Sequence, residues 1–150
     1  MVIVIITHYW KNSPGGGIKM YTRNLVDELK KRDNIKVKVI FKEGKDLENA
    51  KVGGSKFLFP IKTFFVLRKF KPRVIHSQGT WYCLLPGYIY KKIFGGKLIH
   101  TFHTVPDKKL PFLGKIFIQT LLEYCDCVTF VSKGLKNKSK YVYALHESMS

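Results

Sequence analysis

The sequence predicts an α/β protein: a single Rossmann-like domain whose doubly wound parallel sheet carries helices on both faces, giving three α/β/α layers. Short β-branched runs alternate with amphipathic helical patterns along the 150-residue chain, which is typical of parallel βαβ units. The first run, Val2 to Ile6, also leads through a glycine turn at 13–17 into a helical pattern that starts at Ile18. Such a strand, turn and helix form the first unit of a parallel sheet, so we expect about six strands in one domain.

Apolar spacing assigns the segments of the first half in order. Apolar residues recur at helical spacing from Ile18 to about 33 and alternate with lysines over residues 35–41, which predicts a helix and then a strand. The polar segment 42–56 contains glycines and is predicted to be a loop. Phe57-Leu58-Phe59 fits a short strand, and Pro60 suits the first turn of a helix that runs to about Phe70.

The second half repeats the alternation of strand and helix. Lys71-Pro72 stops the preceding helix, and Gly95-Gly96 closes the next one. The predicted elements are a strand at 74–77, a helix at 82–94, a strand at 98–102, a loop at 103–109, a helix at 111–124, a strand at 128–131 and a short helix capped by Ser132 and ending near 138. We assign residues 1–140 to the domain and 141–150 to a C-terminal tail.

The net charge of +17 is the unusual feature of the composition, with 27 basic residues against 10 acidic ones. This charge favours an anionic partner, either nucleic acid, an acidic membrane surface or a phosphate-bearing substrate. One interpretation is therefore a non-catalytic basic α/β module that binds nucleic acid or an anionic surface. The lysines are scattered over helices and loops without a recognised nucleic-acid motif, so nucleic acid is the least favoured of these partners.

Cysteine usage and hydrophobic length predict a cytoplasmic protein. Cys83, Cys125 and Cys127 are odd in number and lack the spacing of a redox or zinc motif, so we expect reduced core thiols. The N-terminal apolar run has no basic leader and is too short for a signal peptide. No uncharged stretch reaches the roughly 20 residues of a membrane span.

The glycine turn has two interpretations. Gly15, Gly16 and Gly17 lack a Cβ, so their backbone N–H groups could hold a phosphate at the positive end of the following helix. The contiguous glycines match neither G-x-G-x-x-G nor a P-loop. A tight turn without a ligand is the alternative.

Polar and aromatic residues are predicted to gather at the carboxyl edge of the sheet, where the C-terminal ends of parallel strands meet. Histidines at this edge could act as acid/base groups, with a structural role for each as the alternative. Asp107 is the only acid placed there, which disfavours a self-contained hydrolase, and no metal site is expected because no ligand set has suitable spacing. The residues of this edge are His8, Tyr9, Trp10, His76, Ser77, Gln78, Trp81, His103, Thr104 and Ser132.

Four segments stand out along the chain: Pro14–Gly17 with its helix, Arg73–Gly79, Leu98–His103 and Cys125–Ser132. In their order and spacing these segments resemble the family 4 glycosyltransferases. Over about residues 1–138 the chain is similar to the N-terminal, acceptor-side domain of a retaining enzyme with the GT-B fold.

This resemblance implies roles for particular residues. Gly15, Gly16 and Gly17 would lie against the diphosphate of a nucleotide-sugar donor, and no other cofactor is expected. His103 would hydrogen-bond near the transferred sugar as the catalytic histidine. The expected acceptor-binding residues are Tyr9, Gln78, Trp81, Thr104 and Ser132.

The resemblance also indicates a missing half. The family's C-terminal donor-binding domain has no counterpart in these 150 residues. We therefore expect the chain to be inactive alone. Two interpretations follow: a separate chain that carries the donor-binding domain completes it as a partner, or the chain is a remnant of such an enzyme.

A mixture of aromatic and basic residues in 57–71 suggests contact with an anionic membrane. Phe64 and Phe65 stand beside Arg68 and Lys69 there, and apolar residues occupy most of the helix circumference. The protein would then be cytoplasmic but peripheral at the membrane. The alternative is that these aromatics are buried against the sheet or the missing domain.

Overall fold

The computed structural model describes residues 1–104 and 110–140, and within them the strands form one six-stranded, fully parallel sheet. The strands are β1 Val2–Tyr9, β2 Lys36–Glu43, β3 Ala50–Lys51, β4 Val74–Gln78, β5 Lys97–Phe102 and β6 Cys127–Phe130. The helices are α1 Gly17–Lys30, α2 Leu58–Phe70, α3 Trp81–Phe94, α4 Phe112–Glu123 and α5 Lys133–Lys140. The strand order is β3-β2-β1-β4-β5-β6, so the predicted Rossmann-like fold is confirmed.

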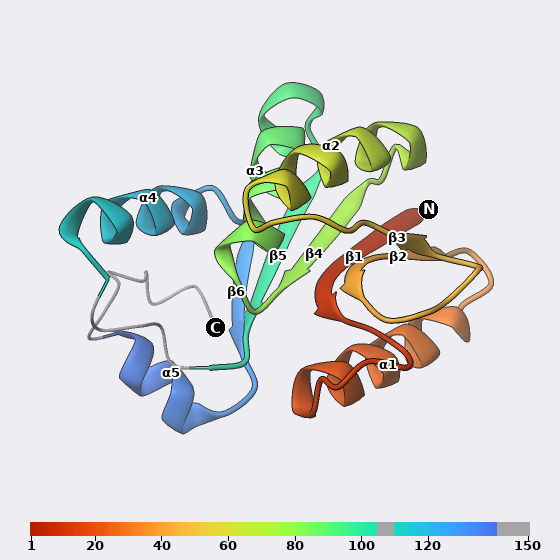
Figure 1. Cartoon of the computed structure of the whole chain (residues 1–150), viewed down its shortest axis with the longest axis horizontal. Helices are drawn as coiled ribbons and strands as arrows, with labels where there is room; N and C mark the ends of the chain where they lie inside the picture. The colour runs from red at the N-terminus through yellow and green to blue at the C-terminus, as the bar shows by residue number, and fades with distance from the viewer. Residues whose placement is uncertain (105–109, 141–150) are drawn as a thin grey trace.

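Helices cover both faces of the sheet (Figure 1). α1 and α5 lie on one side of it, and α2, α3 and α4 lie on the other. The expected three layers are therefore present in the described part of the chain.

The central strand β1 is buried on both faces because its alternate residues enter two different cores. Val4 and Ile6 belong to the larger core cluster, and Ile6 pairs with Ile40 of β2 in that cluster. Ile5 belongs to the smaller cluster, where it pairs with Val39 beneath α1. This burial explains why the β1 sequence is a continuous apolar run instead of an alternating one.

The prediction of a strand at Phe57-Leu58-Phe59 is wrong, because Leu58 and Phe59 form the first turn of α2. Ser55 starts this helix. Its Oγ accepts a hydrogen bond from Leu58 N at 3.2 Å, and its carbonyl oxygen accepts one from Phe59 N at 2.9 Å. Pro60 occupies the first turn as expected.

The predicted loop 42–56 also needs correction, because it contains structure at both ends. β2 continues to Glu43, and the two-residue strand β3 pairs in parallel with Ile40 and Phe41. A hydrogen bond of 2.8 Å from Val52 N to Phe41 O extends this edge. Two residues are too few to leave a periodic pattern in the sequence.

Several predicted details are confirmed. Leu135 N donates to Ser132 Oγ at 3.1 Å, so Ser132 caps α5. Gly95 ends α3 with φ of 78°. Cys83 and Cys125 are buried, and burial raises the pKa of each thiol to about 12, so both stay protonated near neutral pH.

None of the helices in the described residues is long and apolar enough to cross a bilayer. The assigned tail 141–150 lies outside the described residues.

Candidate functional site

The candidate site lies where the strand order reverses, between β1 and β4. From β1, the strands β2 and β3 follow in order toward one edge of the sheet, and β4, β5 and β6 follow in order toward the other edge. A crevice beyond the carboxyl ends of the strands is the usual ligand site at such a point. The glycine turn, Gln78 and His103 all follow or end strands at this edge (Figure 1).

Among the three glycines of the turn, packing requires only Gly15. A Cβ on Gly15 would lie 2.3 Å from Tyr9 Cβ, so a side chain does not fit there. A Cβ on Gly16 or Gly17 would meet nothing within 4 Å. Gly16 is the N-cap of α1, and the first turn of this helix carries no acidic residue. The positive end of the α1 dipole is therefore not offset by a carboxylate from its own first turn.

His103 contacts Gln78 and the side of α1 that faces the sheet. Its Nε2 lies 2.8 Å from Gln78 Oε1, and its ring packs edge-on against Tyr21 with 5.0 Å between centroids. Thr22 Oγ1 lies 3.0 Å from the same Gln78 oxygen. These contacts join the end of β5, the end of β4 and the second turn of α1 into one cluster.

The His103 ring is neutral near pH 7. Burial lowers the pKa of His103 to about 4. Because the Gln78 oxygen only accepts hydrogen bonds, Nε2 of His103 carries the proton in this arrangement. His103 Nδ1 is then an acceptor, suited to a hydroxyl donor on a ligand.

The side-chain amide N–H donors of Gln78 are buried. The residue is 1% exposed, and its Nε2 has no hydrogen-bond partner in the described part of the chain. A buried amide N–H without an acceptor costs about 1–3 kcal/mol. A ligand with an acceptor oxygen at this point would remove that cost.

A pocket of about 450 Å³ adjoins His103. This volume is within the usual range for small-molecule sites, about 300–1,000 Å³. It brings together three residues predicted for the site, His103, Thr104 and Ser132. The remaining lining residues are Val131, Gly134, Leu135 and Lys138.

Tyr9 and Trp81, both predicted for the acceptor site, do not line this pocket. Tyr9 covers Gly15 and packs on His8 with 4.2 Å between ring centroids. Trp81 starts α3 and lies between Phe57 and Phe117, each with a centroid 6.0 Å away. The structure therefore places Trp81 on the side of the sheet that α2 and α4 cover.

Sequence reasoning missed a second polar cluster at the carboxyl edge. His8 Nε2 lies 2.9 Å from Glu43 Oε1, and His8 Nδ1 bonds to the Tyr82 hydroxyl. The hydrogen bond from His8 is the main reason that the pKa of Glu43 is lowered. Both nitrogens of His8 are engaged, so the cluster holds β1, β2 and α3 together and leaves no free base. The predicted second strand ended at residue 41, and extending it by two residues would have placed Glu43 at this edge. Asp107, the acid predicted for this edge, lies outside the described residues.

The remaining strand histidines have structural partners. His76 Nε2 lies 2.6 Å from Thr101 Oγ1, and His100 Nδ1 lies 2.8 Å from Ser77 Oγ. Burial lowers the pKa of His76 to about 4 and that of His100 to about 3, so both are neutral at pH 7. Within the described residues, no group of three or more metal-binding side chains is placed to hold an ion.

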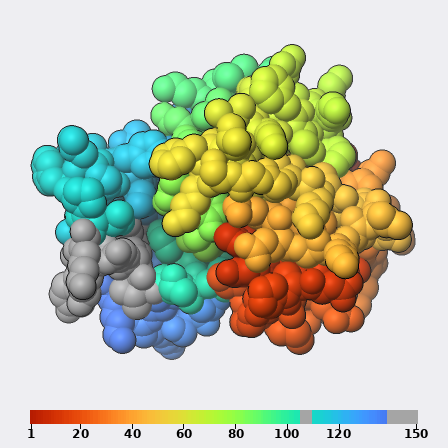
Figure 2. Space-filling view, in the orientation of Figure 1, coloured from red at the N-terminus to blue at the C-terminus, as the bar shows by residue number. Residues whose placement is uncertain are grey.

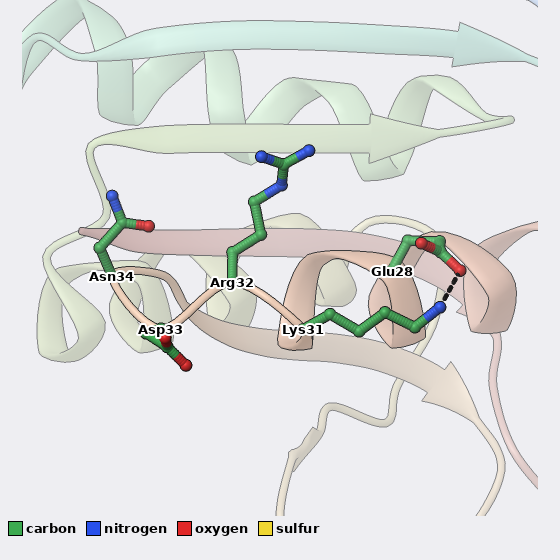
Figure 3. Close-up of a pocket in the computed structure, with 5 residues that line it drawn as sticks. All are labelled: Glu28, Lys31, Arg32, Asp33 and Asn34. Carbon is green, nitrogen blue, oxygen red and sulfur yellow. Dashed lines mark hydrogen bonds and ion pairs between the residues drawn. The ribbon is translucent and has the colours of Figure 1, made fainter.

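A further pocket lies at the opposite edge of the sheet, in the turn between α1 and β2 (Figure 3). It is lined by Glu28, Lys31, Arg32, Asp33 and Asn34. The main-chain oxygen of Asn34 accepts a hydrogen bond from the N-terminal amine of Met1 at 2.7 Å. This pocket is separated from His103 and the glycine turn by the length of the strands.

The strand order and the glycine turn after β1 define a Rossmann-like domain. The sequence model of Glycosyltransferase Family 4 matches residues 15–147. The chain therefore belongs to Glycosyltransferase Family 4, and its domain is GT-B-like.

Solved structures similar to this chain include UDP-N-acetylglucosamine 2-epimerases. The Rickettsia bellii enzyme matches with a TM-score of 0.70 and 12% identity over 99% of this chain and 43% of its own. The Methanocaldococcus jannaschii enzyme has a TM-score of 0.68 and 16% identity over 99% of this chain and 44% of its own. The Neisseria meningitidis enzyme, solved with UDP-GlcNAc, has a TM-score of 0.66 and 14% identity over 99% of this chain and 44% of its own.

These similarities establish the fold, and the chain spans less than half the length of the three epimerases. A search of curated protein sequences found no match.

Proposed function

We propose that this domain is the acceptor-side half of a nucleotide-sugar-dependent retaining glycosyltransferase. The observation that carries the proposal is the His103 and Gln78 pair at the switch point. A neutral imidazole whose Nδ1 can accept a hydrogen bond stands beside a buried amide that has no acceptor among the described residues. Family membership supports the same assignment.

In this proposal the polar groups divide between two substrates. His103 accepts a hydrogen bond from a hydroxyl of the transferred sugar. Gly16 and Gly17 present backbone N–H groups to the donor diphosphate at the positive end of α1. Gln78, Thr104 and Ser132 take part in acceptor binding, with Tyr9 and Trp81 at the margin.

In the arrangement we propose, a donor-binding half completes the enzyme. Support comes from the share of the neighbouring structures that the chain covers, which is 44% of the Methanocaldococcus jannaschii enzyme. Positioning of the donor and stabilisation of the leaving diphosphate would come mainly from the second half.

The proposal predicts that these 150 residues show no transfer or hydrolysis of nucleotide sugars until a donor-binding half is added in trans. Binding is followed by calorimetry with UDP- and GDP-sugars, and turnover by release of the nucleoside diphosphate. In the reconstituted complex, His103→Ala is expected to lower kcat/KM about tenfold, the value of one neutral hydrogen bond.

Asn34→Ala serves as the control, because Asn34 lies at the opposite edge of the sheet. Turnover by the 150-residue chain alone would contradict the need for a second half. Equal effects of His103→Ala and Asn34→Ala would contradict the role of His103. A chain that binds polyanions and never a nucleotide sugar would instead support the non-catalytic basic module.

We also propose that α2 attaches the domain peripherally to an anionic membrane. Leu58, Ile61 and Phe65 are each about half exposed and follow one another at helical spacing along α2. Phe57 is 75% exposed beside them, and Arg68 and Lys69 are exposed on the same helix. Figure 2 shows this part of the chain, in yellow, at the molecular surface. Phe64 is half-buried against the core cluster, so it packs α2 against the core and contributes less to the proposed membrane contact.

Membrane attachment predicts binding to vesicles that contain acidic lipid, and binding that weakens with salt. Phe57→Ser with Phe65→Ser should reduce co-sedimentation at least about tenfold, since burying one such side chain contributes about 1.5–3 kcal/mol. The matched control, Met20→Ser with Leu47→Ser, removes two other exposed apolar side chains. Equal binding to neutral and acidic vesicles, or equal effects of the two double variants, would contradict the proposal.

A further inference from the structure

We propose that a pocket on the outer side of α1, apart from the candidate site, binds the phosphate group of a water-soluble molecule. The pocket has a volume of about 360 Å³ and is lined by Lys11, Asn12, Lys19, Met20 and Arg23. We refer to it as the α1 basic pocket.

Helix geometry separates the α1 basic pocket from the cluster around His103. Ile18, Tyr21 and Thr22 point toward the sheet, where they lie beside Gly79, His103 and Gln78 respectively. Positions 19, 20 and 23 lie on the opposite side of the helix, because each residue advances by about 100°. A ligand in this pocket would therefore not touch His103.

The charge of the α1 basic pocket is unbalanced. Lys11, Lys19 and Arg23 line it, and none of its lining residues in the described part of the chain is a carboxylate. The pocket of Figure 3 is the natural comparison, because there Lys31 and Arg32 are matched by Glu28 and Asp33. Lys31 is bonded to Glu28 at 2.5 Å, so that pocket attracts anions weakly.

Two carboxylates interact with these cations, Asp27 with Arg23 and Asp46 with Lys11, but neither forms a close ion pair with its partner. Asp27 stands 3.9 Å from Arg23, and both side chains are more than half exposed, so this pair is weak. Asp46 accepts hydrogen bonds from Trp10 Nε1 at 2.7 Å and from Asn49 Nδ2 at 2.7 Å.

The loop that carries Lys11 and Asn12 is held in place before any ligand arrives. Lys11 O accepts a hydrogen bond from Lys45 N at 2.9 Å, and Trp10, which is 1% exposed, anchors the loop in the core. Lys19 Nζ donates to Ser13 O at 2.8 Å, which fixes its ammonium group and leaves two N–H donors. Asn12 has φ of 57°, a left-handed conformation that asparagine tolerates. This order lowers the entropy lost when an anion binds.

These groups suit a phosphate better than a carboxylate. A phosphate dianion offers several oxygens to donors from different directions, and a guanidinium can hold two of them at once. The pocket lies with α1, on the opposite side of the sheet from α2 (Figure 1). A bilayer in contact with α2 would lie away from the pocket, which favours a soluble phosphate compound over a lipid headgroup.

Titration of the isotope-labelled chain with inorganic phosphate and with pyrophosphate, followed by amide NMR shifts at low salt, tests the proposal. Saturable shifts are expected at residues 11–12 and 19–23. Lys19→Gln with Arg23→Gln should weaken binding at least about tenfold, since a hydrogen bond to a charged group contributes about 1.5–3 kcal/mol. Lys31→Gln with Arg32→Gln removes the same charge and should change binding less than about twofold.

The single variant Arg23→Gln separates a binding loss from a folding defect. In the described structure Arg23 forms only the exposed pair with Asp27, so this variant should fold normally. It should weaken binding while leaving the circular dichroism spectrum unchanged. Equal losses in the two double variants, shifts spread evenly over the lysines, or no saturable binding would overturn the proposal. Tighter binding of phosphatidylglycerol vesicles than of phosphate at this pocket would overturn the assignment to a soluble ligand.

Discussion

Replacing Phe59 by alanine is expected to lower the free energy of unfolding by about 3–5 kcal/mol, a large part of the stability of a domain of this size. Phe59 is fully buried in the first turn of α2, and its ring meets Tyr82 edge-on with 6.0 Å between centroids. Alanine would leave a cavity between α2 and α3, where the core cannot close completely. Urea denaturation followed by circular dichroism measures the effect.

The matched control for Phe59 is Phe57, two residues earlier. Phe57 is 75% exposed, so Phe57→Ala should change the free energy of unfolding by no more than about 0.5 kcal/mol. If the two variants lost similar stability, the start of α2 at Leu58 and the burial of Phe59 would both be wrong.

These two phenylalanines also mark a limit of prediction from sequence. A three-residue apolar run has no period long enough to separate strand from helix, so Phe57-Leu58-Phe59 fitted either. The helix is decided by Ser55, whose Oγ and carbonyl oxygen bond Leu58 N and Phe59 N. In contrast, β1 was predictable because its first five residues are all apolar and β-branched. β5 was predictable because Gly95-Gly96 precedes a short run that contains Leu98, Ile99 and Phe102.

The candidate site was predictable in position but not in its contacts. Parallel strands put the glycine turn and His103 at one edge whatever the strand order is. The bond from His103 to Gln78 needs β4 and β5 to be neighbours, and the contact with Thr22 needs α1 to lie beside the end of β4. A single sequence carries no signal for these two facts. The pairing of His8 with Glu43 was missed because the second strand was predicted to end at Phe41, two residues before Glu43.

Replacing Gly15 by alanine is expected to lower the free energy of unfolding by about 1–3 kcal/mol, the usual cost of overpacking. The added Cβ would lie 2.3 Å from Cβ and 2.4 Å from Cγ of Tyr9, so either the turn or Tyr9 must move. The ring of Tyr9 also packs against His8, which restricts that movement. Thermal unfolding gives the loss of stability, and the shifts of the His8 and Tyr9 ring resonances report the displacement.

Gly16 and Gly17 provide the controls for Gly15, and they also separate packing from ligand binding in the turn. An added Cβ at either position meets nothing within 4 Å, and Gly17 is already in the first turn of α1. Gly17→Ala should therefore leave stability unchanged or raise it by about 0.4–1 kcal/mol. If the turn holds the donor diphosphate, the Cβ of Gly17→Ala should obstruct the close approach of the phosphate to these N–H groups, so the variant should weaken nucleotide-sugar binding in the reconstituted enzyme without loss of stability. Equal destabilisation by all three substitutions would show that the turn does not have the packing described for Gly15.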